Sequence, residues 1–290
     1  MSSRRTFPFS SRNSSPTGTT RQLLKSVFVT LPLFFVAACE HIPTPAQLAR
    51  HYQLEATWLQ GGDFELLSLA RPGALEGRRL HIYLGGDGQP WQGTQPAHNP
   101  TGRRSMALDL LQQDTAPALY LGRPCYHLGT MPAGCTANLW TAGRYSHTVI
   151  DSMNTALQGL LRGHPNIEEV VLIGYSGGGN LAVLLAPRLR PGVAVAVLTV
   201  AANLDTDAWI AHHRVLPLAD SLNPAGTAST GAGEAHLQGE QDKIVPPATT
   251  RAYFQQHPAA RAIPLAGFDH RCCWVGQWPQ LLALAPQAQR

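Results

Sequence analysis

Residues 170–179 read VVLIGYSGGG, so a single serine lies among glycines where an apolar run ends. The segment fits the pattern G-x-S-x-G, in which the serine occupies a strained turn between a strand and a helix, and small neighbours prevent a backbone clash. In such a turn the hydroxyl points outward, and the following N–H groups lie at a helix N-terminus where they can bind a developing oxyanion. The β-branched run before it and the apolar run after it favour Ser176 as a nucleophile over a simple helix cap.

A serine hydroxyl needs a general base, and the base needs a carboxylate that orients it. In a parallel sheet of this kind, the acid and then the histidine follow the serine along the chain. Asp242 comes shortly after a predicted strand at residues 235–237, and His270 comes after another at residues 262–265. Because the carboxyl ends of parallel strands meet at one edge of a sheet, we expect Asp242 and His270 to lie beside Ser176.

Alternating strands and helices must position these side chains. The alternation from about residue 61 predicts an α/β fold with a mostly parallel central sheet and helices on both faces. Residues 203–231, which are rich in polar residues, glycine and proline, are predicted as a small lid-like insertion. The remaining predicted strands cover residues 64–69, 80–84, 116–121, 170–173 and 193–200, and the predicted helices cover residues 100–112, 142–161, 180–189 and 278–285.

Three motifs occur in order: Gly-Tyr-Ser-Gly-Gly-Gly at 174–179, Gly-x-x-Asp-x-x-Val-Pro-Pro at 239–247 and Gly-Phe-Asp-His at 267–270. Together they resemble the α/β-hydrolase superfamily, and most closely a group of exported bacterial serine hydrolases, over roughly residues 61–290. The resemblance implies Ser176 as nucleophile, Asp242 as acid and His270 as base, with no metal and no organic cofactor.

The resemblance also implies an oxyanion hole. One N–H donor comes from the residue after the nucleophile, here Gly177, and the other from a loop after an early strand. Gly85-Gly86-Asp87-Gly88 resembles the family's H-G-x-G loop with glycine in place of histidine, which assigns the second donor to the backbone of Asp87. A carboxylate at this place opposes the developing charge unless its side chain points away.

Other residues compete for the catalytic roles. Asp205 and Asp207 follow the strand at 193–200, where some members of the superfamily keep the acid, and Asp242 is favoured over both. Asp269 is interpreted as a turn residue. His212 and His213 are interpreted as the surface of the insertion, because no carboxylate or thiol has a matching metal-ligand spacing.

The first 38 residues predict export. Residues 1–26 are polar and basic, residues 27–38 are apolar but too short to span a bilayer as a helix, and Cys39 follows two alanines. This resembles a bacterial lipoprotein signal, in which Cys39 is lipidated; an ordinary secretory signal and a twin-arginine signal are weaker alternatives. The predicted organisation is a signal peptide at 1–38, a tether and lead-in helix at 39–60, and the hydrolase domain at 61–290.

The net charge argues against a nucleic-acid partner. Five of the 22 basic residues lie before Cys39 and no acidic residue does, which leaves 17 basic and 18 acidic residues from there on. No basic stripe therefore remains for nucleic acid.

Export would place the cysteines after Cys39 in an oxidising compartment, which permits disulfides. Cys125 and Cys135 bracket nine residues, a comfortable loop for a disulfide. Cys272 and Cys273 then form a vicinal disulfide or remain thiols. A zinc site and a nucleophilic Cys272 are the weaker interpretations.

Taken together, these features predict a serine hydrolase that cleaves a small acyl ester and is held by a lipid on Cys39 in the bacterial cell envelope, facing the periplasm. A peptidase or an acyltransferase using the same triad is the first alternative. A non-catalytic envelope lipoprotein on a hydrolase scaffold is the second, since a fold alone does not establish activity.

Overall fold

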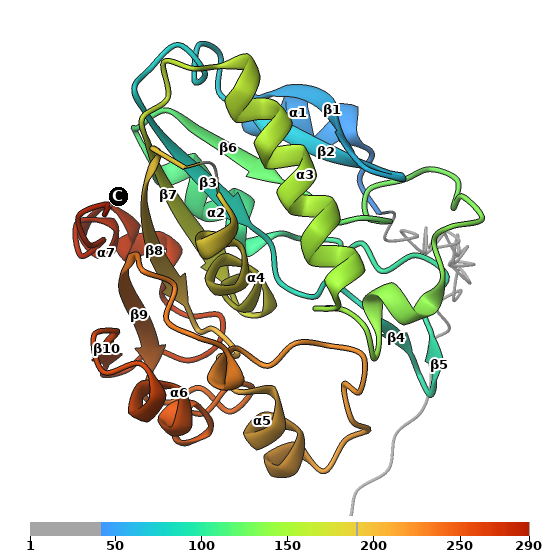
Figure 1. The fold of residues 1–290 in the computed structure, drawn as a ribbon. Coiled ribbons are helices and arrows are strands. Elements are labelled where there is room, and N and C mark those ends of the chain that lie inside the picture. Colours follow the sequence, from blue (N-terminus) through green and yellow to red (C-terminus); the bar gives the residue numbers. More distant parts are fainter. Residues whose placement is uncertain (1–41, 190, 290) are drawn as a thin grey trace, which may run out of the picture. The chain divides into compact units, whose positions relative to one another are not determined.

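Eight strands form one sheet in the order β1-β2-β6-β3-β7-β8-β9-β10 (Figure 1). The computed structural model describes residues 42–189 and 191–289. β2 is antiparallel to both of its neighbours. The six strands β6-β3-β7-β8-β9-β10 are parallel to one another. The strands of the sheet are β1 (Glu55–Gly61), β2 (Phe64–Ala70), β3 (Arg79–Leu84), β6 (Ala118–Leu121), β7 (Glu169–Tyr175), β8 (Ala194–Val200), β9 (Gly233–Gly239) and β10 (Arg261–Leu265).

Helices cover both faces of this sheet, as the continuous apolar pattern of its central strands requires. The core is accordingly divided into two clusters, one beneath α3, α4 and α6 and the other beneath α1, α2 and α7. A short hairpin of β4 (Trp91–Gln92) and β5 (Gln95–Pro96) lies outside the main sheet. The helices are α1 (Pro45–Tyr52), α2 (Met106–Gln113), α3 (His147–Gly163), α4 (Gly177–Leu185), α5 (Thr206–His213), α6 (Arg251–Gln256) and α7 (Trp278–Leu282).

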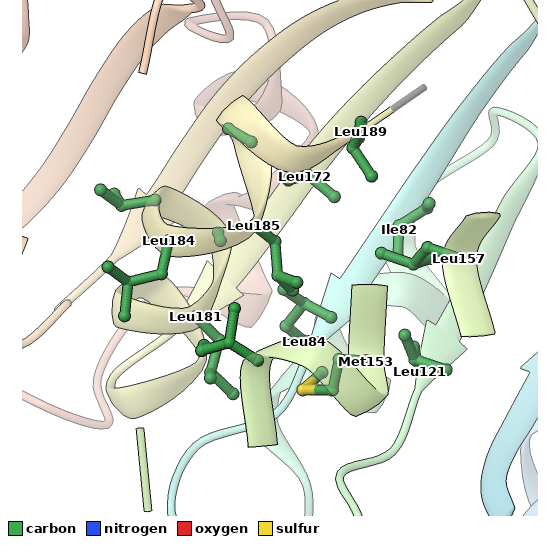
Figure 2. Packing of buried hydrophobic residues seen from close by; sticks show 14 of the residues in the cluster. Ile82, Leu84, Leu121, Met153, Leu157, Leu172, Leu181, Leu184, Leu185 and Leu189 are labelled. Atoms are coloured by element: carbon green, nitrogen blue, oxygen red, sulfur yellow. The ribbon is translucent and has the colours of Figure 1, made fainter. Parts of the chain in front are cut away.

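The first core cluster supports the helix that follows Ser176. Figure 2 shows Leu181 and Leu185 of α4 packed with Met153 and Leu157 of α3 over the central strands. Every side chain of α4 is buried, so this helix lies inside the molecule rather than on its surface. Burial of a leucine side chain contributes about 2 kcal/mol, and the start of α4 is therefore held rigidly against the sheet.

The predicted α/β fold with a mostly parallel sheet is confirmed. All seven predicted strands and four predicted helices are present, with ends that differ by a few residues. The predicted helix at 100–112 begins only at Met106, because Ser105 caps it by accepting a hydrogen bond from Leu108 N–H. Residues 203–231, which were predicted as a lid-like insertion, contain α5 and a short 3₁₀ turn at Pro224–Gly226.

The sheet begins earlier than the predicted domain boundary at residue 61. Residues 55–60, predicted as part of a tether and lead-in, form the edge strand β1 together with Gly61, and this strand pairs with β2 along its whole length. The strand has only one buried residue, Gly61, and exposes Trp58, so it lacks the alternating pattern that marks a strand in sequence. The lead-in helix itself is present as α1.

The predicted signal peptide and Cys39 lie outside the described residues. Within the described part of the chain, no helix is long and apolar enough to cross a membrane. The described residues, 42–189 and 191–289, belong to one compact unit.

Candidate active site

Ser176 lies in a sharp turn between β7 and α4, at the carboxyl end of the sheet. Its backbone has φ of +52° and ψ of −122°, a conformation that non-glycine residues rarely adopt. The turn is held by a hydrogen bond from Ser176 N–H to Val200 O, at 2.8 Å. It also requires a small residue two positions on, because a Cβ on Gly178 would lie 2.1 Å from the carbonyl oxygen of Leu84. The glycines of the motif thus permit a turn that presents the serine hydroxyl at the sheet edge.

The structure brings Ser176, His270 and Asp242 together in one chain of hydrogen bonds. His270 Nε2 lies 3.1 Å from Ser176 Oγ, and His270 Nδ1 lies 2.8 Å from Asp242 Oδ2. The Asp242 side chain is fully buried and the His270 side chain is 13% exposed. With the Nδ1 proton donated to the carboxylate, Nε2 carries the lone pair that faces the serine hydroxyl.

The turn after β9 fixes the position of Asp242. The second oxygen of its carboxylate, Oδ1, accepts hydrogen bonds from the N–H groups of Ile244 and Val245, both at 2.8 Å. Only Oδ2 is then left to face the imidazole. Both oxygens of this buried carboxylate are satisfied, and its orientation is set by the backbone.

The loop that carries His270 is held from both sides. Tyr175 O–H donates to the carbonyl oxygen of His270 at 2.8 Å, and the indole N–H of the buried Trp274 donates to the same oxygen at 3.2 Å. Asp269 closes the turn by accepting from Arg271 N–H and Cys272 N–H, both at 2.7 Å. These two backbone hydrogen bonds lower the pKa of Asp269. Asp269 is therefore a turn residue, as the sequence indicates.

The loop from Gly85 to Gly88 packs directly against the nucleophile. A Cβ on Gly86 would lie 3.4 Å from Ser176 Cβ, and one on Gly88 would lie 2.2 Å from the carbonyl oxygen of Pro100. Gly88 also has a φ of +67°, so both its conformation and its surroundings require glycine. The glycines allow this loop to approach the serine closely enough to contribute a backbone donor.

Asp87 presents its backbone N–H, and not its carboxylate, as the free polar group. The carboxylate is bound by Arg123 Nη2 at 2.9 Å, Arg144 Nη1 at 3.0 Å and Tyr145 O–H at 2.8 Å. Among residues 42–189 and 191–289, no group accepts a hydrogen bond from the N–H of Asp87 or of Gly177. Both N–H groups predicted as oxyanion donors are thus available to a ligand.

The competing residues have other partners. Asp205 caps α5 by accepting from the N–H groups of Asp207 and Ala208, both at 3.1 Å, and it also binds Asn223. The ring of His213 lies 2.8 Å from the carbonyl oxygen of Ile244. Asp207 and His212 are exposed. In the part of the chain that the structure describes, none of these side chains reaches His270 or Ser176.

Two disulfides are present among the described residues, Cys125–Cys135 and Cys272–Cys273. The second lies in the His270 loop, where Cys272 O accepts from Asp269 N–H. No group of three or more His, Cys, Asp or Glu side chains within residues 42–189 and 191–289 is arranged to hold a metal ion.

Sequence reasoning missed the residues that surround Asp87. Arg123 lies two residues after the end of β6, at the same sheet edge as Ser176, so its position after a strand end could have indicated it. Arg144 and Tyr145 precede α3 in a loop that does not follow the end of a strand. Nothing in their spacing relates them to Asp87, which is 57 and 58 residues away.

No protein-family profile matches the chain, and no curated protein matches its sequence. Solved structures do resemble it. An esterase of Pyrococcus furiosus matches with a TM-score of 0.56 and 14% identity, over 83% of this chain and 93% of that chain. An alpha-beta serine hydrolase homologue from Coxiella burnetii matches with a TM-score of 0.50 and 14% identity, over 79% of this chain and 94% of that one.

An acylaminoacyl peptidase of Pyrococcus horikoshii matches with a TM-score of 0.52 and 12% identity, over 79% of this chain and 39% of that chain. At these identities the likeness concerns the fold. The sheet order, the turn at Ser176 and the structural neighbours agree that this chain has the α/β-hydrolase fold.

Proposed function

We propose that this protein is a serine hydrolase that cleaves acyl esters through a covalent acyl-enzyme. The observation that carries the proposal is the unbroken hydrogen-bond chain from Ser176 Oγ through His270 to the buried Asp242. A serine that merely caps a helix needs neither partner, and Ser176 makes no side-chain cap hydrogen bond to α4. The arrangement matches the roles of nucleophile, base and orienting acid.

In the first half-reaction, Ser176 Oγ attacks the acyl carbon while its proton passes to His270 Nε2. The carbonyl oxygen becomes an anion that the N–H groups of Gly177 and Asp87 bind. Collapse of this intermediate breaks the ester bond, and His270 returns its proton to the departing alcohol. Asp242 keeps its negative charge throughout and stabilises the imidazolium that forms in between.

In the second half-reaction, a water molecule takes the place of the alcohol. His270 removes one of its protons, the resulting hydroxide attacks the acyl carbon, and the same two N–H groups bind the second oxyanion. When the intermediate collapses, the bond to Ser176 Oγ breaks, the oxygen recovers its proton from His270, and the carboxylic acid leaves.

Labelling with a fluorophosphonate probe tests the proposal. The probe should add one phosphonyl group to the wild-type protein, located on Ser176 by mass spectrometry, and none to Ser176→Ala. Ser229→Ala is the matched control, because Ser229 is exposed and its hydroxyl oxygen accepts a hydrogen bond from the nearby Gly231 N–H. A folded wild-type protein that stays unlabelled would favour the non-catalytic scaffold.

A substrate panel separates esters from amides. We expect hydrolysis of p-nitrophenyl acyl esters to exceed that of the matching p-nitroanilides, since an alcohol leaves more easily than an amine from the same intermediate. Faster cleavage of peptides than of every ester would instead support a peptidase, and transfer of the acyl group to an added alcohol in preference to water would support an acyltransferase.

The lipid anchor on Cys39 and the periplasmic location belong to this proposal as well. They rest on the apolar segment at 27–38 and the cysteine that follows it. In a bacterial host, the wild-type protein should fractionate with membranes and take up labelled palmitate, whereas Cys39→Ser should do neither. Equal palmitate labelling of the two proteins contradicts the assignment.

A further inference from the structure

A charged cluster lies buried beneath the loop that carries Asp87. It consists of Asp87, Arg123, Arg144 and Tyr145, and the side chains of Arg123 and Arg144 are only 4% and 7% exposed. Two guanidinium groups face a single carboxylate. Arg123 Nε and Nη1 have no hydrogen-bond partner among the described residues, so its charge is only partly matched.

The protonation states leave this cluster with a net charge of about +1. Burial alone would raise the pKa of Asp87, but the charges of Arg123 and Arg144 hold it below its usual value, so the carboxylate is ionised at neutral pH. Although burial opposes it, the Asp87 charge raises the pKa of both guanidinium groups. Burial raises the pKa of Tyr145, which therefore stays neutral.

The cluster also fixes the shape of the loop. Arg123 Nη2 donates to the carbonyl oxygen of Gly85 at 3.2 Å, and Tyr126 O–H donates to the carbonyl oxygen of Asp87 at 2.9 Å. These two carbonyls belong to the peptide planes on either side of the one that bears the Asp87 N–H, so the loop is held both before and after this donor.

The carboxylate touches the residue that supplies the other N–H donor. A Cβ on Gly177 would lie 1.9 Å from Asp87 Oδ1 and 2.5 Å from Tyr145 Oη, so both groups pack against the start of α4. An uncompensated carboxylate at this place would repel the oxyanion that forms beside it, since the interior screens charge weakly. Because two arginines face the one carboxylate, the net charge of the cluster is positive instead of negative.

We propose that Arg123 and Arg144 are positioning residues for the reaction, which together outweigh the charge of Asp87 and give the oxyanion hole a positive support. The inference rests on the proposed function, because it assigns the cluster to the oxyanion of that same reaction. Arg123 additionally holds the loop through Gly85, whereas Arg144 reaches the loop only through the carboxylate of Asp87. Arg144 is therefore the residue with which charge can be tested most cleanly.

Two single variants change the net charge of the cluster, and two further variants keep it at +1. Arg144→Met lowers it to 0, Asp87→Asn raises it to +2, and the double variant restores +1. We expect Arg144→Met to reduce kcat about 10- to 100-fold with little change in KM, the effect of one unit charge acting over roughly 6–12 Å at an effective dielectric constant of about 20. Arg144→Lys keeps the charge and should remain closer to the wild type than to Arg144→Met.

The double variant Asp87→Asn/Arg144→Met is the decisive measurement. If the charge balance matters, it should be at least several-fold faster than Arg144→Met, although it lacks one more native group. If the cluster only holds the fold together, the double variant should be no faster than the single one, and that result overturns the inference. A folded Arg144→Met with kcat within threefold of the wild type also overturns it.

Folding and the underlying reaction are monitored separately. Arg71→Met is the matched control, because Arg71 binds carbonyl groups at the end of α2, at the opposite edge of the sheet, and should lower stability but leave kcat unchanged. Should Arg144→Met not fold, Arg144→Gln and the double variant Asp87→Asn/Arg144→Gln replace the two Met variants, with the same expected order of kcat and the same result overturning the inference. If the fluorophosphonate leaves the wild-type protein unlabelled, the proposed function and this inference are both overturned. If it labels the wild type but the double variant is no faster than Arg144→Met, only the inference is overturned.

Discussion

Replacing Asp242 with asparagine exchanges one oxygen of the buried carboxylate for an NH₂ group and should slow the reaction by about 10⁴. Oδ1 of Asp242 accepts from the N–H groups of Ile244 and Val245, so an asparagine must keep its oxygen there and direct its NH₂ group toward His270. A donor now faces His270 Nδ1, 2.8 Å away in the wild type. The imidazole must present its lone pair to that donor and carry its proton on Nε2.

This change of tautomer determines how far kcat should fall. A protonated Nε2 at 3.1 Å from Ser176 Oγ can donate to the hydroxyl but cannot accept its proton. Loss of the base in an otherwise intact triad costs about 10⁴ in kcat, or about 5 kcal/mol of transition-state stabilisation. The free energy of unfolding should change by less than about 2 kcal/mol, because the two backbone hydrogen bonds to Oδ1 survive.

Asp205→Asn is the matched control, since it makes the same chemical change at another buried aspartate. Asp205 caps α5 through one oxygen that accepts from Asp207 N–H and Ala208 N–H, and asparagine caps a helix equally well. We expect its kcat to stay within about threefold of the wild type. The assay is initial-rate hydrolysis of a p-nitrophenyl ester, with urea denaturation of each variant. An Asp242→Asn protein that keeps a tenth of the wild-type kcat, or an Asp205→Asn protein that loses 10³ of it, refutes the assignment of the acid.

Three further predictions concern stability. Burial lowers the pKa of His127 to about 4, so the free energy of unfolding is highest above the unfolded pKa of about 6.5 and falls by about 3 kcal/mol as the pH falls to 4. The urea midpoint of His127→Gln should fall less than that of the wild type over this pH range, and an equal fall contradicts the assignment. Removing the Cys125–Cys135 disulfide, whose cysteines are 10 residues apart, in a double alanine variant should lower the free energy of unfolding by about 3 kcal/mol, and reduced wild type should match that variant. Leu172→Ala, in the core, should cost about 2–5 kcal/mol, whereas Leu216→Ala, at a residue that is 74% exposed, should change stability by less than about 0.5 kcal/mol; similar losses at both would contradict the core in Figure 2.

The predicted fold depended on local patterns, and these were reliable where burial is two-sided. β7 and β8 are apolar along nearly their whole length, because α4 covers one face and α2 and α7 lie on the other. The edge strand β1 was not predicted, because its residues are mostly exposed and show no apolar pattern. Its pairing with β2 depends on backbone hydrogen bonds, which do not require particular side chains.

The sequence alone determined which residues could act as nucleophile, acid and base. Ser176 was marked by its glycines, which a strained turn requires, and Asp242 and His270 by the chain order and the strands before them. These are local features, because a turn conformation and a strand end are encoded by neighbouring residues.

Only the tertiary structure showed that Asp242, and not Asp205, lies beside His270, and that the Asp87 carboxylate turns toward Arg123 and Arg144. Both outcomes depend on contacts between residues tens of positions apart, which form when separate strands and loops meet at one edge of the sheet. The net charge beside the oxyanion hole is a sum over such contacts, and no stretch of the sequence contains it.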